Sequence, residues 1–172
     1  MKKTTGFYPR VRVDAAGGSA VGQAGGVLLT STVRAAGLGA GLSAALAPWR
    51  PVGATHDPAK VVLDLALTLA LGGDTCSDLA VVRAEPAVFG PVASDPTLSR
   101  TIARLAADVD KVLAAIDRAR AAARSRVWAA AGTHAPDHDV DARRPVVVDV
   151  DATLVTSHSP GMSTGSWPVS GP

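Results

Sequence analysis

The sequence predicts a mainly α-helical protein that leads into the first strand or strands of an α/β domain. Hydrophobic residues make up 47% of the 172 residues but aromatic residues only 3%, and much of the hydrophobic share is alanine, which favours helix. Between residues 98 and 116, apolar residues recur at alternating spacings of four and three, which is typical of an amphipathic helix. Residues 145–150 carry a run of valines instead, and β-branched residues favour a strand.

Changes in composition divide the chain into five regions. Residues 1–26 are rich in glycine and begin with a basic arm, which we interpret as a flexible, solvated terminus or as an arm that contacts DNA. A helical region covers residues 27–131, and a polar linker, GTHAPDHDVDARR, covers residues 132–144. A strand region follows at residues 145–159. Residues 160–172 are rich in Gly, Ser and Pro without any period, which predicts a disordered tail.

Start and stop signals place the helices of the central region. Asp57 is a good N-cap and Pro58 suits the first helical position, while Gly37 and the Gly72-Gly73 pair are typical of helix ends. We therefore expect helices over residues 27–36, 38–46, 58–71 and 75–84, a loop over residues 87–93, and a long helix that starts at Pro96. The helix over residues 58–71 is apolar nearly all round, so we expect it to be buried on most sides.

The long helix predicted from Pro96 has one apolar and one basic face. Its apolar residues fall within about 40° of one line at 100° per residue: Leu98, Ile102, Leu105, Val109, Val112 and Ile116. Its cations share the opposite face: Arg100, Arg104, Lys111 and Arg118. In one continuous helix this basic stripe would be about 27 Å long. It is either a solvated helix face or a surface that follows phosphates along a DNA groove.

The helices at 58–71 and 75–84, together with the helix from Pro96, are compatible with a helix-turn-helix-like unit that binds double-stranded DNA. Arg83, in the second of these helices, joins the basic stripe as a DNA-binding candidate. A formal charge of +2 and a pI near 9.0 permit nucleic-acid binding without requiring it.

Other features of the sequence indicate a cytoplasmic protein without a membrane partner. The longest apolar run, residues 61–71, contains Asp64 and is too short to span a bilayer. Cys76 is the one cysteine, which rules out an internal disulfide, and we expect it to be a small core residue. The histidines and aspartates of the linker lack the spacing of a metal site, so we interpret them as solvated residues: His134, Asp137, His138, Asp139 and Asp141.

Asp149 and Asp151 are the candidate catalytic and metal-binding residues. Side chains alternate along a strand, so the two carboxylates of PVVVDVDATLVTSH project from the same side and could hold a divalent cation. The string DVDAT satisfies the D-x-D-x-T pattern of haloacid-dehalogenase-like phosphatases, with Asp149 as nucleophile and Asp151 as general acid/base. Alternatively, the strand opens an RNase H-like core, in which three carboxylates hold two Mg²⁺ ions. A third interpretation is a strand that ends in two solvated acids.

Three strings carry a resemblance to a known family: TTGFYPRVRVD, HDPAKVVLDLALTLALGGDTCSDLAVVRAEPAVFGPVASDPTLSR and HAPDHDVDARRPVVVDVDATLVTSHS. Residues 4 to about 158 resemble the N-terminal part of bacterial insertion-sequence transposases of the DDE type, most closely the group named for insertion sequence thirteen-eighty. The resemblance implies that Asp151 is the first acid of the DDE triad, with Asp149 as the runner-up, and that the second Asp and the Glu lie beyond residue 172. The tail PGMSTGSWPVSGP does not resemble the family.

From this resemblance we expect a truncated transposase that binds DNA at the terminal inverted repeats of its element. The full-length family would cleave DNA and transfer strands with Mg²⁺, whereas we expect this chain alone to be inactive, because by the resemblance it lacks most of the catalytic domain. The alternatives are a DNA-binding regulatory fragment without catalysis and half of a haloacid-dehalogenase-like phosphatase. Homodimerisation is also left open.

Overall fold

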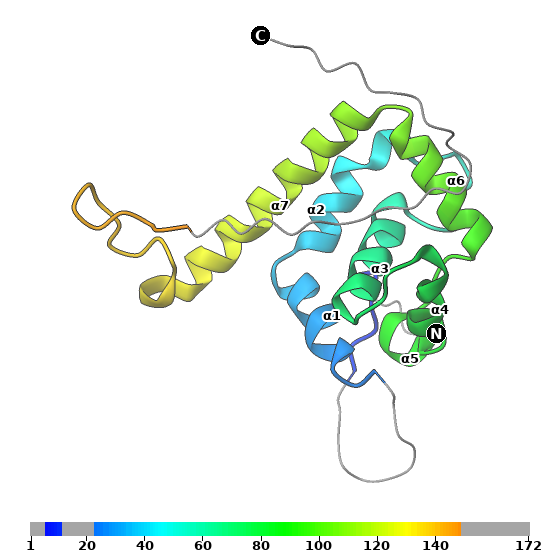
Figure 1. Cartoon of the computed structure of the whole chain (residues 1–172), viewed down its shortest axis with the longest axis horizontal. Coiled ribbons are helices and arrows are strands. Elements are labelled where there is room, and N and C mark those ends of the chain that lie inside the picture. The colour runs from blue at the N-terminus through cyan, green and yellow to red at the C-terminus, as the bar shows by residue number, and fades with distance from the viewer. Residues whose placement is uncertain (1–5, 12–22, 149–172) are drawn as a thin grey trace, which may run out of the picture. The chain divides into compact units, whose positions relative to one another are not determined.

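A computed structural model describes residues 6–11 and 23–148, and within these ranges the protein is mainly helical and has no β-strand. The helices are α1 (Gly26–Ala35), α2 (Leu38–Ala45), α3 (Pro58–Ala70), α4 (Leu79–Arg83), α5 (Pro86–Phe89), α6 (Asp95–Ala106) and α7 (Val109–Ala131), joined by the 3-10 turns η1 (Ala47–Trp49), η2 (Cys76–Asp78) and η3 (Gly132–His134) (Figure 1). The chain divides into two compact units after His138, a point inside the linker predicted at residues 132–144. The mainly α prediction is confirmed.

Local sequence signals explain where several helices begin and end. Gly37, with φ of 67°, adopts the left-handed conformation that lets α1 turn directly into α2. At the same turn, Arg126 of α7 donates a hydrogen bond of 3.3 Å to the carbonyl oxygen of Ala36. As predicted, Asp57 caps α3, because its side chain accepts a hydrogen bond of 2.9 Å from the backbone N–H of Ala59.

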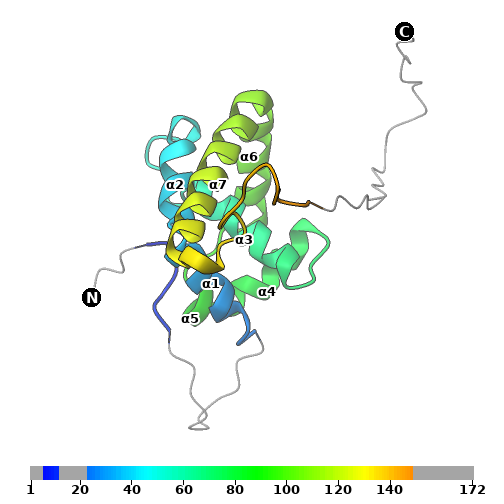
Figure 2. The same cartoon turned by 90° about the vertical axis from the view of Figure 1, so that its left-hand side faces the viewer.

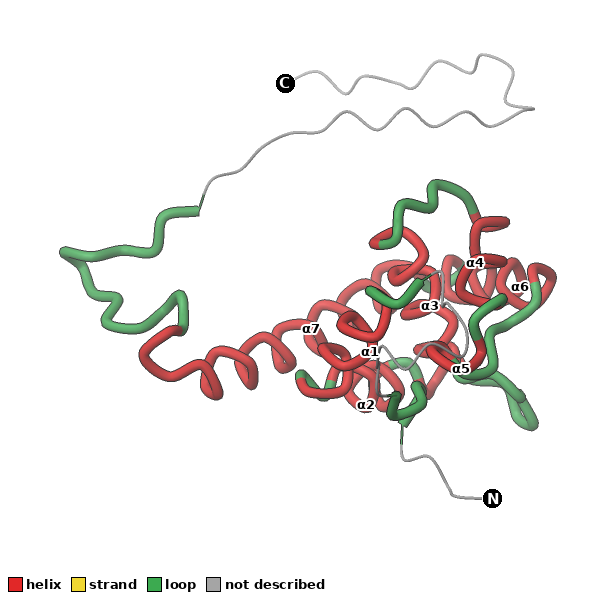
Figure 3. Tube along the Cα trace, turned by 90° about the horizontal axis from the view of Figure 1, so that it is seen from below, coloured by secondary structure: helices red, strands yellow, loops and turns green. Residues whose placement is uncertain are grey.

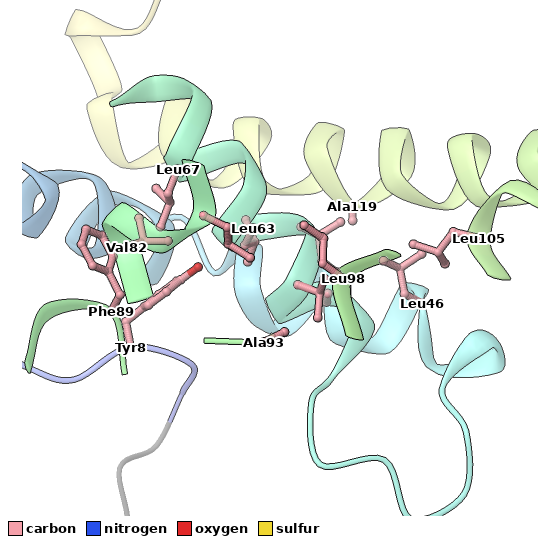
Figure 4. Packing of buried hydrophobic residues seen from close by; sticks show 14 of the residues in the cluster. Tyr8, Leu46, Leu63, Leu67, Val82, Phe89, Ala93, Leu98, Leu105 and Ala119 are labelled. Atoms are coloured by element: carbon pink, nitrogen blue, oxygen red, sulfur yellow. The ribbon is translucent and has the colours of Figure 1, made fainter. Parts of the chain in front are cut away.

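The core of the first unit forms between α2 and α3 and the helices packed on them. α2 packs against both α7 and α3, and α3 also contacts α4 and α6 (Figures 1 and 2). Gly41 of α2 has no side chain, and a Cβ built there would lie 3.9 Å from that of Ala119, so α2 and α7 can approach closely. Leu46, Leu79, Leu98 and Phe89 are among the largest side chains that are completely buried (Figure 4).

The N-terminal segment, residues 6–11, also packs against this core. Tyr8 is buried, and its hydroxyl donates a hydrogen bond of 3.0 Å to Oδ1 of Asp64 in α3. The guanidinium of Arg34 in α1 donates a hydrogen bond of 3.3 Å to the carbonyl oxygen of Tyr8 and one of 2.7 Å to that of Pro9. The N-terminal segment is therefore attached to two helices through both its side chain and its backbone.

A buried ion pair lies beneath Tyr8. The Lys60 ammonium donates a hydrogen bond of 2.5 Å to each carboxylate oxygen of Asp64. Its nitrogen lies 4.7 Å from the centre of the Tyr8 ring. Burial raises the pKa of Asp64 to about 6, although Lys60 and Tyr8 act in the opposite direction, and burial lowers the pKa of Lys60. Burial and the Asp64 charge raise the pKa of Tyr8. The predicted all-round burial of α3 thus extends to two charged side chains.

The long helix predicted from Pro96 is wrong in one respect, because it is interrupted after Ala106. Asp108, with φ of −137° and ψ of 46°, is not helical and starts a second helix, α7. The predicted apolar line is consequently split: Leu98, Leu105 and Val112 are buried, but Ile102 and Val109 are 38% and 48% exposed. Figure 3 shows α7 extending beyond the other helices, and its buried residues end at Ala123.

Two further expectations are corrected between α3 and α6. The segment predicted as one helix over residues 75–84 is the turn η2 followed by the short α4, with Thr75 in the capping position of the turn. Asp78 accepts hydrogen bonds from the backbone N–H groups of Asp74 and Thr75, which stabilises the turn as a capping box. The loop predicted at residues 87–93 contains most of α5, and Cys76 is exposed rather than part of the core.

The second unit is described only over residues 139–148. Asp141 and Arg144 form an isolated antiparallel bridge, and residues 145–148 belong to no helix or strand. Val147 and Val148 are 82% and 73% exposed, so this part of the predicted buried strand is not seen. A strand is stabilised by hydrogen bonds to a neighbouring strand, and the described residues offer none. Asp149, Asp151 and the tail at residues 160–172 lie outside the described residues.

Candidate nucleic-acid interface

A basic hollow of about 410 Å³ lies between α6 and the loop that precedes α3. It is lined by Pro51, Val52, Gly53, Ala54, Thr55, His56, Pro58, Thr97, Arg100, Thr101 and Arg104. Two of the predicted DNA-binding residues, Arg100 and Arg104, therefore lie at one site. No acidic side chain is among these lining residues.

The periodicity of α6 places its four lining residues on one edge of the helix. Positions 97, 100, 101 and 104 follow the spacing i, i+3, i+4 and i+7, which brings side chains to one side of an α-helix. Leu98 and Leu105 are buried in the core beside them and fix the rotation of the helix. The helix thus buries its leucines while its two arginines remain exposed at the hollow.

The loop opposite α6 is held by the Asp57 carboxylate. Besides capping α3, this carboxylate accepts a hydrogen bond of 2.6 Å from the Ser43 hydroxyl and forms an ion pair of 3.2 Å with Arg50. Within the loop, the N–H of Ala54 donates a hydrogen bond of 3.1 Å to the carbonyl oxygen of Pro51. Gly53 at this turn has φ of 73°, a conformation that favours glycine. The segment between α2 and α3 extends away from the buried cluster (Figure 4).

The chemistry of the hollow suits an anion with several oxygen atoms. The two guanidinium groups carry permanent positive charge, and guanidinium groups bind phosphate oxygens through paired hydrogen bonds. Thr55, Thr97 and Thr101 add hydroxyl groups, although Thr101 donates to the carbonyl oxygen of Thr97 at 2.8 Å. Burial and the nearby Lys60 ammonium lower the pKa of His56, so this imidazole is mainly neutral at neutral pH. A phosphodiester backbone matches these groups in charge and in hydrogen bonding.

The other two residues of the predicted basic stripe lie on α7. Lys111 is exposed and forms an ion pair of 3.1 Å with Asp108, and Arg118 is exposed with no hydrogen bond or ion pair to any described residue. Because α6 ends before α7 begins, the four cations do not form one stripe on a single helix. The continuous 27 Å stripe is therefore wrong, while the pairing of Arg100 with Arg104 is retained.

Arg83 occupies a different environment from the other candidates. Its guanidinium donates to the carbonyl oxygen of Ala93 through two nitrogen atoms, at 3.2 and 2.9 Å, and to Oδ1 of Asp95 at 2.6 Å. These bonds connect α4 to the start of α6 and use the Nε and Nη2 atoms of the guanidinium. The structure thus gives Arg83 a packing role, which sequence patterns alone do not reveal.

The predicted carboxylate site cannot be built from the described residues. Asp149 and Asp151 lie outside them, and the described ranges contain no group of three His, Cys, Asp or Glu residues that could hold a metal ion. No single described helix is long and apolar enough to cross a membrane; α1 and α2, bent by 66°, reach that length and composition only as a pair.

Residues 51–56, including His56, line the hollow but were not predicted from the sequence as site residues. The signal that could have identified them is the Pro51–Gly53 turn directly before the Asp57-Pro58 helix start, since loops at helix starts often carry binding groups. The missed partner of Asp64 is Tyr8, which lies too far away in the sequence for a local pattern to connect them.

Comparison with protein-family models identifies a family for this chain. Residues 3–164 match a family model described as "Transposase DDE domain group 1". No curated protein and no solved structure matches the chain.

Proposed function

Because this chain belongs to the family of group 1 transposase DDE domains, we propose that its helical unit binds the terminal inverted repeats of an insertion sequence. Membership of the family makes the function of transposase type and implies DNA as a partner. We also propose that the chain belongs to the group named for insertion sequence thirteen-eighty, that it binds specifically at the ends of its element, and that it acts in the cytoplasm. A homodimer, in which each copy would hold one end of the element, is part of the same proposal.

The observation that carries this proposal is the basic hollow beside α6. Arg100 and Arg104 line one edge of it with hydroxyl groups around them, and no acid among its lining residues would repel a phosphate. A single strand of the DNA backbone would run past α6 and present its oxygens to the two guanidinium groups. Contacts of this kind position a duplex and make its affinity depend on salt.

We further propose that α3, α4 and α6 act as a helix-turn-helix-like unit with α6 as the helix nearest the DNA. α3 contacts both α4 and α6, so the three helices share one small core. The surface of α6 turned away from that core exposes Ser99, Arg100, Ala103 and Arg104. The small side chains of Ser99 and Ala103, each next to one of the two arginines, leave room for a duplex to approach closely.

The chemistry is assigned to the carboxylates of the second unit. We propose Asp151 as the first acid of the DDE triad, with Asp149 as the runner-up, on the basis of family membership and the string DVDAT. Transposases of this family typically use a divalent metal. Bound Mg²⁺ would activate the attacking water or hydroxyl and stabilise the leaving oxygen. The role of the helical unit is to hold the DNA and fix its register.

Salt-dependent binding tests the proposal. Fluorescence anisotropy would follow a labelled terminal-repeat duplex and a scrambled duplex over a range of salt concentrations. Replacing both Arg100 and Arg104 by alanine should weaken binding and lower the slope of log K against log salt by about 2, because two phosphate contacts are lost.

A second variant of equal charge serves as the matched control. Lys111→Ala combined with Arg118→Ala removes the same charge from α7, and its slope shows whether α7 contributes phosphate contacts of its own. If the α6 variant kept the parent's affinity and slope, the hollow would not be the interface. Circular dichroism of each variant would establish that the helical unit is still folded.

A further inference from the structure

The loop opposite α6 ends in an exposed apolar tip. Val52 has a relative exposure of 106%, and Pro51 and Gly53 on either side are also exposed. Single exposed apolar residues are common on protein surfaces, so exposure by itself decides little. What distinguishes Val52 is its place, because it lines the same hollow as Arg100 and Arg104.

The tip is held in a defined position. The Ala54 N–H to Pro51 carbonyl bond closes the turn around Val52, and the Arg50 guanidinium also reaches the carbonyl oxygen of Ala54, at 3.5 Å. Arg50 in turn pairs with Asp57, which caps α3. Pro51 restricts the backbone before the tip. An apolar group on such a turn loses little conformational freedom when it makes a contact, so the contact retains more of its free energy.

The position of the tip indicates what it would meet. If the proposed interface is correct, Arg100 and Arg104 hold backbone phosphates, and a duplex whose major groove faces the loop meets Val52 there. The apolar group that a base edge presents in the major groove is the C5-methyl group of thymine. Val52 presents an isopropyl group at the exposed tip of the loop, and this group has the apolar character that such a contact requires.

We propose that Val52 is a specificity-determining residue that reads the methyl group of a thymine in the major groove beside the phosphates held by α6. The inference rests on the proposed DNA-binding function and deepens it: Arg100 and Arg104 provide affinity for any sequence, and Val52 provides preference at one base pair. Because Val52 makes no core contact, its replacement leaves the fold unchanged.

The test combines a protein change with a base change. Parent, Val52→Ser and Leu28→Ser would be titrated against the terminal-repeat duplex and against duplexes in which each thymine in turn is replaced by uracil, which lacks only the methyl group. Leu28 is another exposed apolar residue, on α1 and away from the hollow, and serves as the control. At one thymine, parent and Leu28→Ser should lose about fourfold in affinity, the equivalent of one buried methyl group.

Val52→Ser should bind the unmodified duplex about fourfold more weakly and should not respond further to that uracil. If the parent binds but no thymine shows this coupling to Val52, the assignment of Val52 is wrong while DNA binding stands. If the parent binds no duplex, or the Arg100 and Arg104 double variant keeps its full affinity, the proposed interface itself fails. The two failures are therefore distinguishable.

Discussion

Lys60 and Asp64, one turn apart on α3, form an ion pair in which 7% of the lysine side chain and 1% of the aspartate side chain are exposed. Tyr8 completes the pair by donating to the carboxylate from the N-terminal segment. A buried pair of this kind gains attraction but loses hydration, so it is a weak source of net stability and a strong constraint on substitution.

Removing only one partner of this pair should be strongly destabilising. Lys60→Met leaves the Asp64 carboxylate buried without its cation, and we expect a loss of about 3–5 kcal/mol in the free energy of unfolding. The double variant Lys60→Met with Asp64→Leu removes both charges and should lie much closer to the parent. Urea unfolding of the three proteins measures the difference, and equal stabilities for the single and double variants would contradict the expectation.

The acid dependence of stability should carry a signature of Asp64. Burial raises its pKa from an ordinary value of 3.8 to about 6, so between about pH 4 and pH 6 the folded state binds a proton that the unfolded state does not. Its contribution therefore increases as the pH falls through 6 towards 4 and is lost as the pH rises through 6, with a slope on the order of 1 kcal/mol per pH unit.

The variant that lacks both Lys60 and Asp64 is the reference for this measurement, because other acids titrate in the same range. The difference in unfolding free energy between parent and reference should change in favour of the parent on acidification from pH 7 to pH 4. A difference that stays constant across that range would show that the carboxyl titrates normally in the folded protein.

The Asp57 carboxylate should stabilise the fold, because it bonds to three partners at the start of α3. Asp57→Ala removes the cap of α3 together with the bonds to Ser43 and Arg50, and we expect a loss of about 1–2 kcal/mol. Asp57→Asn retains a capping oxygen but not the charge, so its loss should be smaller. Thermal unfolding compares them, and an alanine variant as stable as the asparagine variant would contradict the capping role.

Arg83 should affect stability but not DNA binding. Arg83→Ala removes the bonds to Ala93 and Asp95, and we expect a loss of about 1–2 kcal/mol, discounted because the partner Asp95 is exposed. The slope of DNA affinity against salt should equal that of the parent. A slope reduced by about 1 would instead return Arg83 to the set of phosphate contacts.

Local signals in the sequence predicted some elements well. The Asp57-Pro58 pair determines both the start and the capping geometry of α3, and Gly37 marks the turn between α1 and α2, because each acts through its own backbone neighbours. The paired spacing of Arg100 and Arg104 likewise depends only on helical periodicity. These features need no knowledge of distant residues.

The predictions from the sequence are wrong where contacts between distant residues determine the structure. The apolar spacing continues across Ala107 and Asp108, so periodicity alone favours one helix, whereas two helices can each turn their leucines and valines towards the same core. Cys76 lies in an exposed capping turn because Asp78 bonds backbone groups there. The second side of the hollow comes from a loop whose position depends on Ser43 and Arg50, and no short pattern connects those residues to α6.

The bond between Tyr8 and Asp64 also sets an order of events during synthesis of the chain. The two residues are 56 positions apart, so at about 5–20 residues per second the ribosome adds Asp64 roughly 3–11 seconds after Tyr8. During that interval the tyrosine has no partner on α3, and Arg34 is the earlier of its two anchors to be made. Residues 6–11 therefore make all of these contacts only after both α1 and α3 have been synthesised.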